Sequence, residues 1–328
     1  MPRALETLAA TLLAALLTTS AFAQPVPPRP KSVTEERLAT ARAGVAALGK
    51  QWNAEVSAAT ERLYVDVHRT VDSSGIQVKS NLRYGPDPQQ TLDLYVPDGG
   101  FSEPSLVLVY LHGGDFAHGD KVGSSGDGLI YGNVARFIAR AGGIGVNANY
   151  RLAPAAKWPS GAEDVRLLLE WLHANIAPYG GDTTNIILMG SSVGATHIAT
   201  YLLKQDAQLR DGPGVSAAIL ASGAFGDFDD VPGARDYFGK RRGARTPLQL
   251  VDVYRGKTVP ILLWSGEYDV TSVEADVDAM YAKLSRNYGA VPTLAKLPGH
   301  NRVSPVLSFD TGDMSVMGPL MRFYHSVR

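Results

Sequence analysis

Short apolar runs alternate with helix-length segments over most of the chain, and this alternation constrains the fold more than any other feature. Because the runs are continuously apolar, they are typical of strands buried on both faces of a mostly parallel sheet covered by helices. With 45% hydrophobic residues, the chain has ample material for such a core. We predict an α/β fold with strands at residues 106–111, 144–149, 186–189, 217–221, 261–264 and 293–297.

Two further segments precede these strands. Residues 76–84 and 92–96 alternate between polar and apolar positions and flank a turn-rich Gly-Pro-Asp-Pro sequence, which predicts an antiparallel pair at the sheet edge. Before them, residues 32–63 carry apolar side chains, Trp52 among them, at helical spacing, and Ser32 with Glu35 fits a capping box. We therefore expect a single domain over residues 32–328, with 32–63 as an N-terminal helical extension.

The first residues have the pattern of a targeting segment. Arg3 precedes an apolar run at residues 8–17, and Ala21-Phe22-Ala23 fits a cleavage signal, so residues 1–23 are predicted to be a signal peptide. The run is too short to span a bilayer. Residues 24–31 contain four prolines and are predicted to be an extended tether. These features predict export to the periplasm or the medium after cleavage behind Ala23, with no stable membrane span afterwards; the alternative is a retained membrane anchor.

Charge and cysteine content exclude several classes of function. The formal net charge of −1 gives no support for a nucleic-acid partner, and the absence of cysteine excludes thiol catalysis and cysteine-ligated metal sites. The acidic group Asp227, Asp229 and Asp230 lacks the spacing of a known calcium loop, so we interpret it as a solvated turn. We expect neither a metal nor a cofactor.

A glycine-flanked serine follows the predicted strand at residues 186–189. The sequence Gly190-Ser191-Ser192-Val193-Gly194 fits G-x-S-x-G between a strand and a helix, which is the pattern of a nucleophile elbow. The glycine spacing selects Ser192 rather than Ser191 as the nucleophile. The start of the following helix would direct its amide dipoles towards the reacting oxygen.

Backbone donors for an oxyanion are expected near this serine. The sequence His112-Gly113-Gly114 closes the predicted strand at residues 106–111, and glycines let the main chain approach a reacting carbonyl closely. The expected donors of this oxyanion hole are the amides of Gly113, Gly114 and Val193.

A general base and a carboxylate are expected after later strands. Asp269 follows the strand at residues 261–264, and His300 is the histidine that follows the final strand. The order serine, acid, histidine is the one expected for this architecture, with the acid orienting the imidazole. Glu267 is the rival for the acid. We predict a triad of Ser192, Asp269 and His300.

Several ordered motifs resemble the hormone-sensitive-lipase-like esterases. They are His112-Gly113-Gly114, Tyr150-Arg151-Leu152-Ala153-Pro154 with Trp158-Pro159, Glu163-Asp164-Val165, and the elbow after Gly180-Gly181-Asp182. The similarity covers residues 92–300. It implies an α/β-hydrolase fold and a carboxylic-ester hydrolase that uses an acyl-enzyme and no cofactor. In that family N-terminal helices often cap the active site, a role that residues 32–63 would then have. Trp52, on the apolar face of this helical stretch, is expected either to fold over the active site or to pack against the sheet edge.

Two departures from that family leave the substrate open. Asp115 stands where a third glycine is common, and Val193-Gly194-Ala195 stands where Ala-Gly-Gly is common. The Asp115 region also resembles kynurenine-formamidase-like esterases. We expect a small-molecule ester, with a short acyl chain, as the substrate; the alternatives are an amide or formamide hydrolase with the same triad and a non-catalytic ligand-binding protein. Arg151 is expected to hold Asp164 or Asp115, or to form a surface ion pair.

Overall fold

The computed structural model describes residues 32–226, 228, 231–239 and 245–327. The predicted signal peptide (1–23), the predicted tether (24–31) and the acidic residues Asp227, Asp229 and Asp230 lie outside the described residues.

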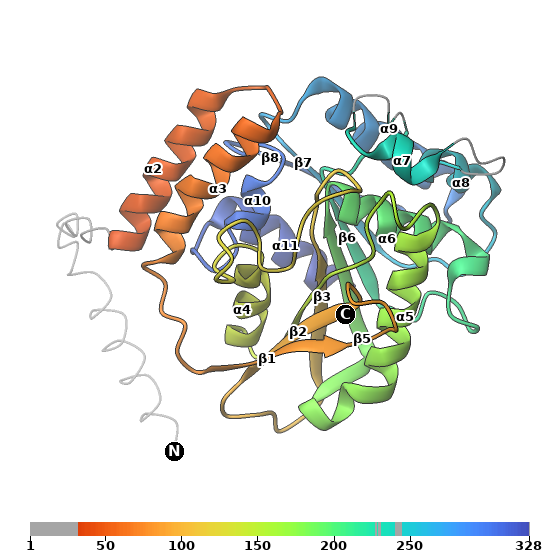
Figure 1. Cartoon of the computed structure of the whole chain (residues 1–328), viewed down its shortest axis with the longest axis horizontal. Coiled ribbons are helices and arrows are strands. Elements are labelled where there is room, and N and C mark those ends of the chain that lie inside the picture. The colour runs from red at the N-terminus through yellow and green to blue at the C-terminus, as the bar shows by residue number, and fades with distance from the viewer. Residues whose placement is uncertain (1–31, 227, 229–230, 240–244, 328) are drawn as a thin grey trace, which may run out of the picture. The chain divides into compact units, whose positions relative to one another are not determined.

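One sheet organises the described part of the chain (Figure 1). Its strand order is β1-β2-β4-β3-β5-β6-β7-β8. Strands β3 to β8 run parallel to one another, while β1 and β2 form an antiparallel pair at one edge, so the predicted fold class is confirmed. The strands are β1 (Ile76–Arg83), β2 (Thr91–Pro97), β3 (Ser105–Leu111), β4 (Ile144–Ala148), β5 (Gly181–Ser191), β6 (Ala217–Ala221), β7 (Ile261–Gly266) and β8 (Thr293–Leu297).

Helices cover both faces of this sheet (Figure 1). Successive residues of a strand point to opposite faces, so a strand buried on both sides must be apolar throughout. In β3, Val109 packs with the core that contains α5, α6, α8 and α9, and Tyr110 packs with the core that contains α2, α3, α4, α10 and α11. The helices are α2 (Val33–Leu48), α3 (Ala54–His68), α4 (Gly132–Arg140), α5 (Ser160–Asn175), α6 (Val193–Leu203), α7 (Ala234–Phe238), α8 (Pro247–Val253), α9 (Thr271–Asn287), α10 (Ser304–Leu307) and α11 (Met314–Ser326), with 3₁₀ turns η1 (Ala177–Tyr179) and η2 (Gln205–Ala207).

The N-terminal extension forms two helices rather than one. Gly49 adopts a positive φ of 68° directly after α2, which a residue with a side chain rarely tolerates, and the helix ends there. Asn53 then caps α3 by accepting a hydrogen bond from the amide of Val56 at 2.9 Å. Trp52 therefore lies in the connection between the two helices. The prediction that it lies on a helical face is wrong.

The strand order reverses direction at β3. Strand β4, which follows β3 along the chain, lies beside β3 on one side within the sheet. The next strand, β5, lies beside β3 on the other side. At such a reversal the loops that follow the two strands diverge and leave room for a ligand at the carboxyl ends. The loop after β3 begins at His112 and the turn after β5 contains Ser192, so both predicted motifs lie at this reversal.

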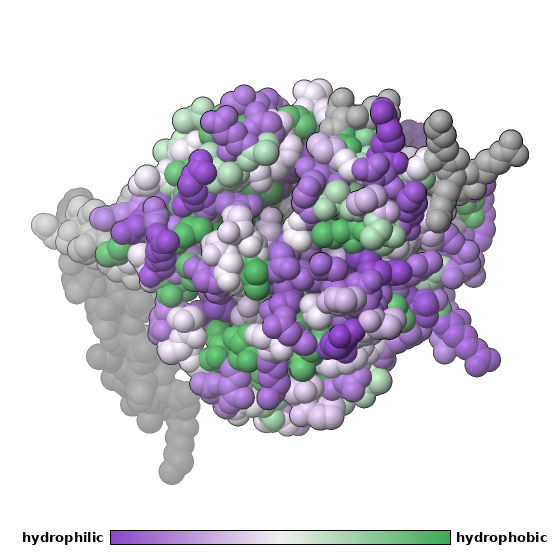
Figure 2. Space-filling model, in the orientation of Figure 1, coloured by the Kyte–Doolittle hydropathy of each residue, from purple (hydrophilic) through white to green (hydrophobic). Residues whose placement is uncertain are grey.

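Polar and apolar side chains are interspersed over the face shown in Figure 2. Among the described residues, no helix combines the length and the apolar character needed to cross a bilayer. The same residues contain no cluster of three or more side chains suited to hold a metal ion.

Candidate active site

Ser192 occupies a strained turn between β5 and α6. Its backbone angles are φ 52° and ψ −118°, a region that residues with a side chain rarely adopt. The turn depends on its glycines: a Cβ on Gly190 would lie 2.4 Å from the carbonyl carbon of Gly194, and one on Gly194 would lie 2.2 Å from the carbonyl oxygen of Leu111. The predicted tight turn between strand and helix is therefore present. Its serine is buried, with 5% of its surface exposed.

The glycine loop after β3 lies against this serine. A Cβ on Gly113 would lie 3.3 Å from Cβ of Ser192, so the loop backbone passes directly beside the hydroxyl. Within the described chain, the amides of Gly113 and Gly114 donate none of the loop hydrogen bonds. Val193 is the first residue of α6, so its amide has no acceptor inside the helix. These three amides are free to donate to an anionic oxygen.

The group in contact with the Ser192 hydroxyl is a guanidinium. Nη2 of Arg302 donates a hydrogen bond to Oγ of Ser192 at 2.9 Å. Only 6% of Arg302 is exposed, and the guanidinium carbon lies 5.7 Å from the ring centre of Trp52. Burial lowers the pKa of Arg302, while the nearby carboxylate of Asp269 acts in the opposite direction. An arginine keeps its proton even so, and it cannot accept one from the serine.

Asp269 supplies a buried carboxylate next to this pair. Its Oδ2 accepts hydrogen bonds from Oγ of Ser222 and from the amide of Gly266, both at 2.8 Å. Its Oδ1 has no hydrogen-bond partner among the described residues. Burial raises the pKa of Asp269 to about 6, against the effect of the two hydrogen bonds and of Arg302. The rival acid Glu267 is exposed and accepts a hydrogen bond from the amide of Gly299 at 2.7 Å.

His300 is buried but turned to a different set of partners. Its Nδ1 lies 3.0 Å from Oγ of Ser304, and its Nε2 lies 2.8 Å from Oγ of Ser315 and 3.5 Å from a carboxylate oxygen of Asp313. Burial lowers the pKa of His300, which keeps the ring neutral at pH 7. Both ring nitrogens are therefore engaged on the side of α10 and α11.

The structure thus brings together only part of the predicted site. It places Ser192 beside the predicted donor loop and Asp269 close to the same centre, but no hydrogen bond among the described residues joins His300 to Ser192 or to Asp269. The predicted contact between imidazole and hydroxyl is absent, and Arg302 contacts the hydroxyl instead. The catalytic roles of the three residues stay predictions. Our sequence reasoning missed Arg302 because it considered histidines alone, although Arg302 lies two residues after His300 in the same loop.

Supporting contacts surround the donor loop. Arg151 holds the buried Asp164 through its Nε and its amide, both at 2.8 Å, so the predicted contact with Asp164 is present. Its Nη2 also forms an ion pair with the half-exposed Glu163 at 3.1 Å, so a surface ion pair is present as well. On the other side of the loop, the ring of Phe116 stacks on Tyr237 of α7 with centroids 4.7 Å apart. The segment between β6 and β7 therefore contributes an aromatic wall next to the site.

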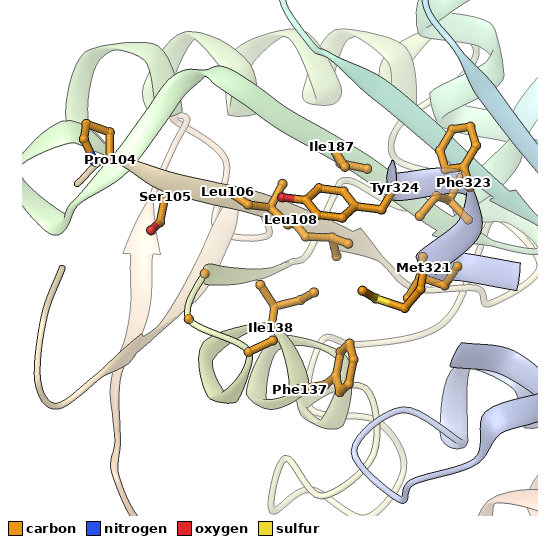
Figure 3. A pocket seen from close by; sticks show the side chains of 15 residues that line it. Pro104, Ser105, Leu106, Leu108, Phe137, Ile138, Ile187, Met321, Phe323 and Tyr324 are labelled. Carbon is orange, nitrogen blue, oxygen red and sulfur yellow. The ribbon is translucent and has the colours of Figure 1, made fainter. Parts of the chain in front are cut away.

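A separate cavity lies at the opposite end of β3 (Figure 3). It has a volume of about 230 Å³ and is lined by the first residues of β3 with Phe137 of α4 and Tyr324 of α11, among others. Since β3 begins at Ser105 and ends at Leu111, this cavity faces the amino ends of the strands, whereas Ser192 follows a carboxyl end. It is therefore not part of the candidate active site.

The chain is similar in sequence to esterases and to a plant hormone receptor. Residues 92–211 match the BD-FAE family model. The chain is 29% identical over 157 residues to esterase LipC of Mycobacterium tuberculosis, covering 46% of this chain and 37% of that protein. It is 30% identical over 151 residues to the gibberellin receptor GID1 of Oryza sativa subsp. japonica, covering 44% and 40%. The chain thus spans well under half the length of these relatives.

Structural similarity extends over more of the chain. Esterase B of Lactobacillus rhamnosis, in a crystal structure with a tributyrin phosphonate inhibitor, aligns with a TM-score of 0.66 and 21% identity, over 89% of this chain and 96% of that chain. At this identity the similarity is evidence for the fold alone. Together with the observed sheet order, this similarity shows that the chain has the α/β-hydrolase fold.

Proposed function

We propose that this protein is a serine hydrolase that cleaves carboxylic esters at Ser192. One observation carries the proposal: the strained elbow holds the Ser192 hydroxyl against a backbone loop whose amides are free to donate. Strain of this kind persists at functional sites because the surrounding structure over-determines it. The esterase relatives support esters as the class of substrate.

The proposed reaction proceeds through an acyl-enzyme. Oγ of Ser192 loses its proton and attacks the ester carbonyl, and the amides of Gly113, Gly114 and Val193 donate to the oxyanion that forms. Collapse of this intermediate expels the alkoxide, which takes a proton from water to become the alcohol, and an acyl group remains on Ser192. Water then attacks the acyl carbon, breaks the bond to Oγ and releases the acid, which restores the hydroxyl.

The acceptor of the serine proton is the unusual part of this scheme. His300 would act as base only if its ring left Ser304 and Ser315. In the observed arrangement the Arg302 cation instead stabilises the alkoxide of Ser192, and solvent water or hydroxide takes the proton. We assign to Asp269 the role of balancing the charge of Arg302.

Access to the site favours small substrates. Ser192 is 5% exposed, and Phe116 and Tyr237 pack with Val193 in one buried cluster beside it. We therefore propose short-chain acyl esters as substrates. The competing assignment is an amide or formamide hydrolase. Because amines leave less readily than alkoxides, the rates of cleavage of a butyrate ester and of the matched amide, measured at equal concentration, distinguish the two.

A phosphonate ester that reacts with activated serines tests the proposed nucleophile. The purified protein is incubated with a p-nitrophenyl butylphosphonate at alkaline pH, and the modified residue is located by mass spectrometry. We expect one adduct on Ser192, its loss in Ser192→Ala, and its retention in the control variant Ser191→Ala, whose hydroxyl contacts Tyr110 instead. An adduct that persists in Ser192→Ala, or no adduct in the wild type, contradicts the proposal.

Residues 1–23 are proposed to direct export and then to be removed. The apolar run and the small residues at positions 21 and 23 support this assignment. N-terminal sequencing of protein recovered from the host cell envelope tests it, and the expected first residue is Gln24.

A further inference from the structure

The guanidinium of Arg302 places a buried positive charge directly at the Ser192 hydroxyl. Nη2 donates to Oγ of Ser192, in the place that a proton acceptor would need. A guanidinium has five donors and no acceptor, so it favours an anionic oxygen at this point. The anion can be the serine alkoxide or an oxygen of a bound ligand.

The carboxylate nearby does not satisfy this guanidinium. Within the described chain, Nε of Arg302 and Oδ1 of Asp269 are both buried without a hydrogen-bond partner. Asp269 directs its other oxygen to Ser222 and Gly266, so the two charges face each other without a hydrogen-bonded ion pair. A buried charge without a bonded partner is costly, and a ligand that supplies an anionic oxygen would lower that cost.

The donors around Ser192 match a carboxylate in number and position. On one side are the amides of Gly113, Gly114 and Val193, the last at the positive end of the α6 dipole. On the other side is Arg302, and both groups meet at Oγ of Ser192. One carboxylate oxygen can accept from the amides while the other accepts from the guanidinium, a charge-assisted arrangement.

We infer that this site binds a short monocarboxylate, with Arg302 as its charge partner, so that the protein retains the acid that ester cleavage releases. The inference rests on the proposed function for the identity of the acid, but binding itself requires no reaction. Trp52 covers the guanidinium from the N-terminal connection and encloses the bound anion. Because its ring lies over the charge, its fluorescence reports occupation of the site.

Calorimetric titration of the full chain with butyrate and with butyramide tests the inference. The two ligands have the same length, but only butyrate carries a charge. We expect saturable binding of butyrate, at least about tenfold weaker binding of butyramide, and a loss of at least about tenfold in butyrate affinity in Arg302→Gln, as for a hydrogen bond to a charged group. Arg255→Gln, which removes an exposed arginine away from the site, is the matched control and should bind as the wild type does.

Two further arms keep the result interpretable. Ser192→Ala removes the nucleophile and leaves Arg302 and the amides in place, so it should still bind butyrate even though it cannot cleave an ester. Binding without phosphonate labelling in the wild type would therefore overturn the proposed function and leave this inference standing. Equal binding of butyrate and butyramide, or no binding of either, overturns the inference. If Arg302→Gln does not fold, the fluorescence of the wild type is titrated with butyrate instead. We expect quenching that is absent in Trp52→Phe. An unchanged Trp52 signal overturns the inference.

Discussion

Replacing Arg302 with histidine should raise the rate of ester cleavage. The substitution removes the cation from Oγ of Ser192 and places an imidazole between that oxygen and the unpartnered Oδ1 of Asp269. One ring nitrogen can then accept the serine proton while Asp269 accepts a hydrogen bond from the other, the arrangement of a serine-hydrolase triad. General-base assistance contributes roughly 10²- to 10⁴-fold.

The lower end of that range applies here. Histidine is shorter than arginine, so the loop after β8 must move towards Ser192 before the imidazole reaches Oγ. We expect kcat/KM for p-nitrophenyl butyrate to rise by about 10²-fold, which corresponds to about 2.7 kcal/mol in the barrier.

The assay compares initial rates of the wild type, Arg302→His, Arg302→Gln and the double variant Ser192→Ala/Arg302→His. Arg302→Gln controls for loss of the cation alone and should show no increase, because glutamine is not a base. The double variant gives the background from reactions that do not use Ser192. A rate in Arg302→His that equals the wild-type rate, with the fold intact by circular dichroism, would refute the assignment of Arg302 to the place of the base.

Three other predictions follow from the same structure. Gly194→Ala should destabilise the fold and remove phosphonate labelling, because the new Cβ would lie 2.2 Å from a backbone oxygen of Leu111; urea unfolding measures the loss. Burial lowers the pKa of His68 to about 4 and of His197 to about 3, so the unfolded state alone gains these protons as pH falls below about 6.5. Stability should therefore fall from pH 6.5 towards pH 4, by up to about 1.4 kcal/mol per pH unit for each histidine, and His197→Gln should flatten the curve. Trp52→Ala should weaken butyrate binding without changing the unfolding midpoint by more than a few degrees, since the ring is only partly buried; thermal unfolding with and without butyrate measures both.

Sequence periodicity predicted the sheet because each strand of this fold is apolar on both faces. The run at β3 packs into two cores at once, and only a buried parallel strand requires that composition. The glycines at 190 and 194 predicted the elbow for a similar reason, since the turn leaves no room for a Cβ at either position.

Local signals also existed where our prediction was incomplete. Gly49 and Asn53 end one helix and cap the next, but the apolar spacing continues across both and suggested one helix. The sequence contains the residues that end α2 and cap α3, but the apolar periodicity alone does not indicate that the helix is interrupted there.

The side chain that contacts the Ser192 hydroxyl could not be predicted from local sequence signals in this way. His300 and Arg302 follow the same strand, two residues apart, and the sequence contains nothing that states which side chain turns towards Ser192. The outcome depends on partners from distant segments: Ser315 and Asp313 hold the imidazole, while Trp52 covers the guanidinium. Residue type favoured histidine, and tertiary packing places arginine there.

The pH dependence of ester cleavage in the wild type tests most directly whether an imidazole serves Ser192. The measurement is kcat/KM for p-nitrophenyl butyrate from acid to alkaline pH, corrected with Ser192→Ala and repeated with His300→Gln. With Arg302 on the hydroxyl and solvent as the proton acceptor, the rate should increase through the neutral range without levelling, and the slope should be the same in His300→Gln. A plateau above an apparent pKa near that of histidine, present in the wild type and lost in His300→Gln, would contradict the account.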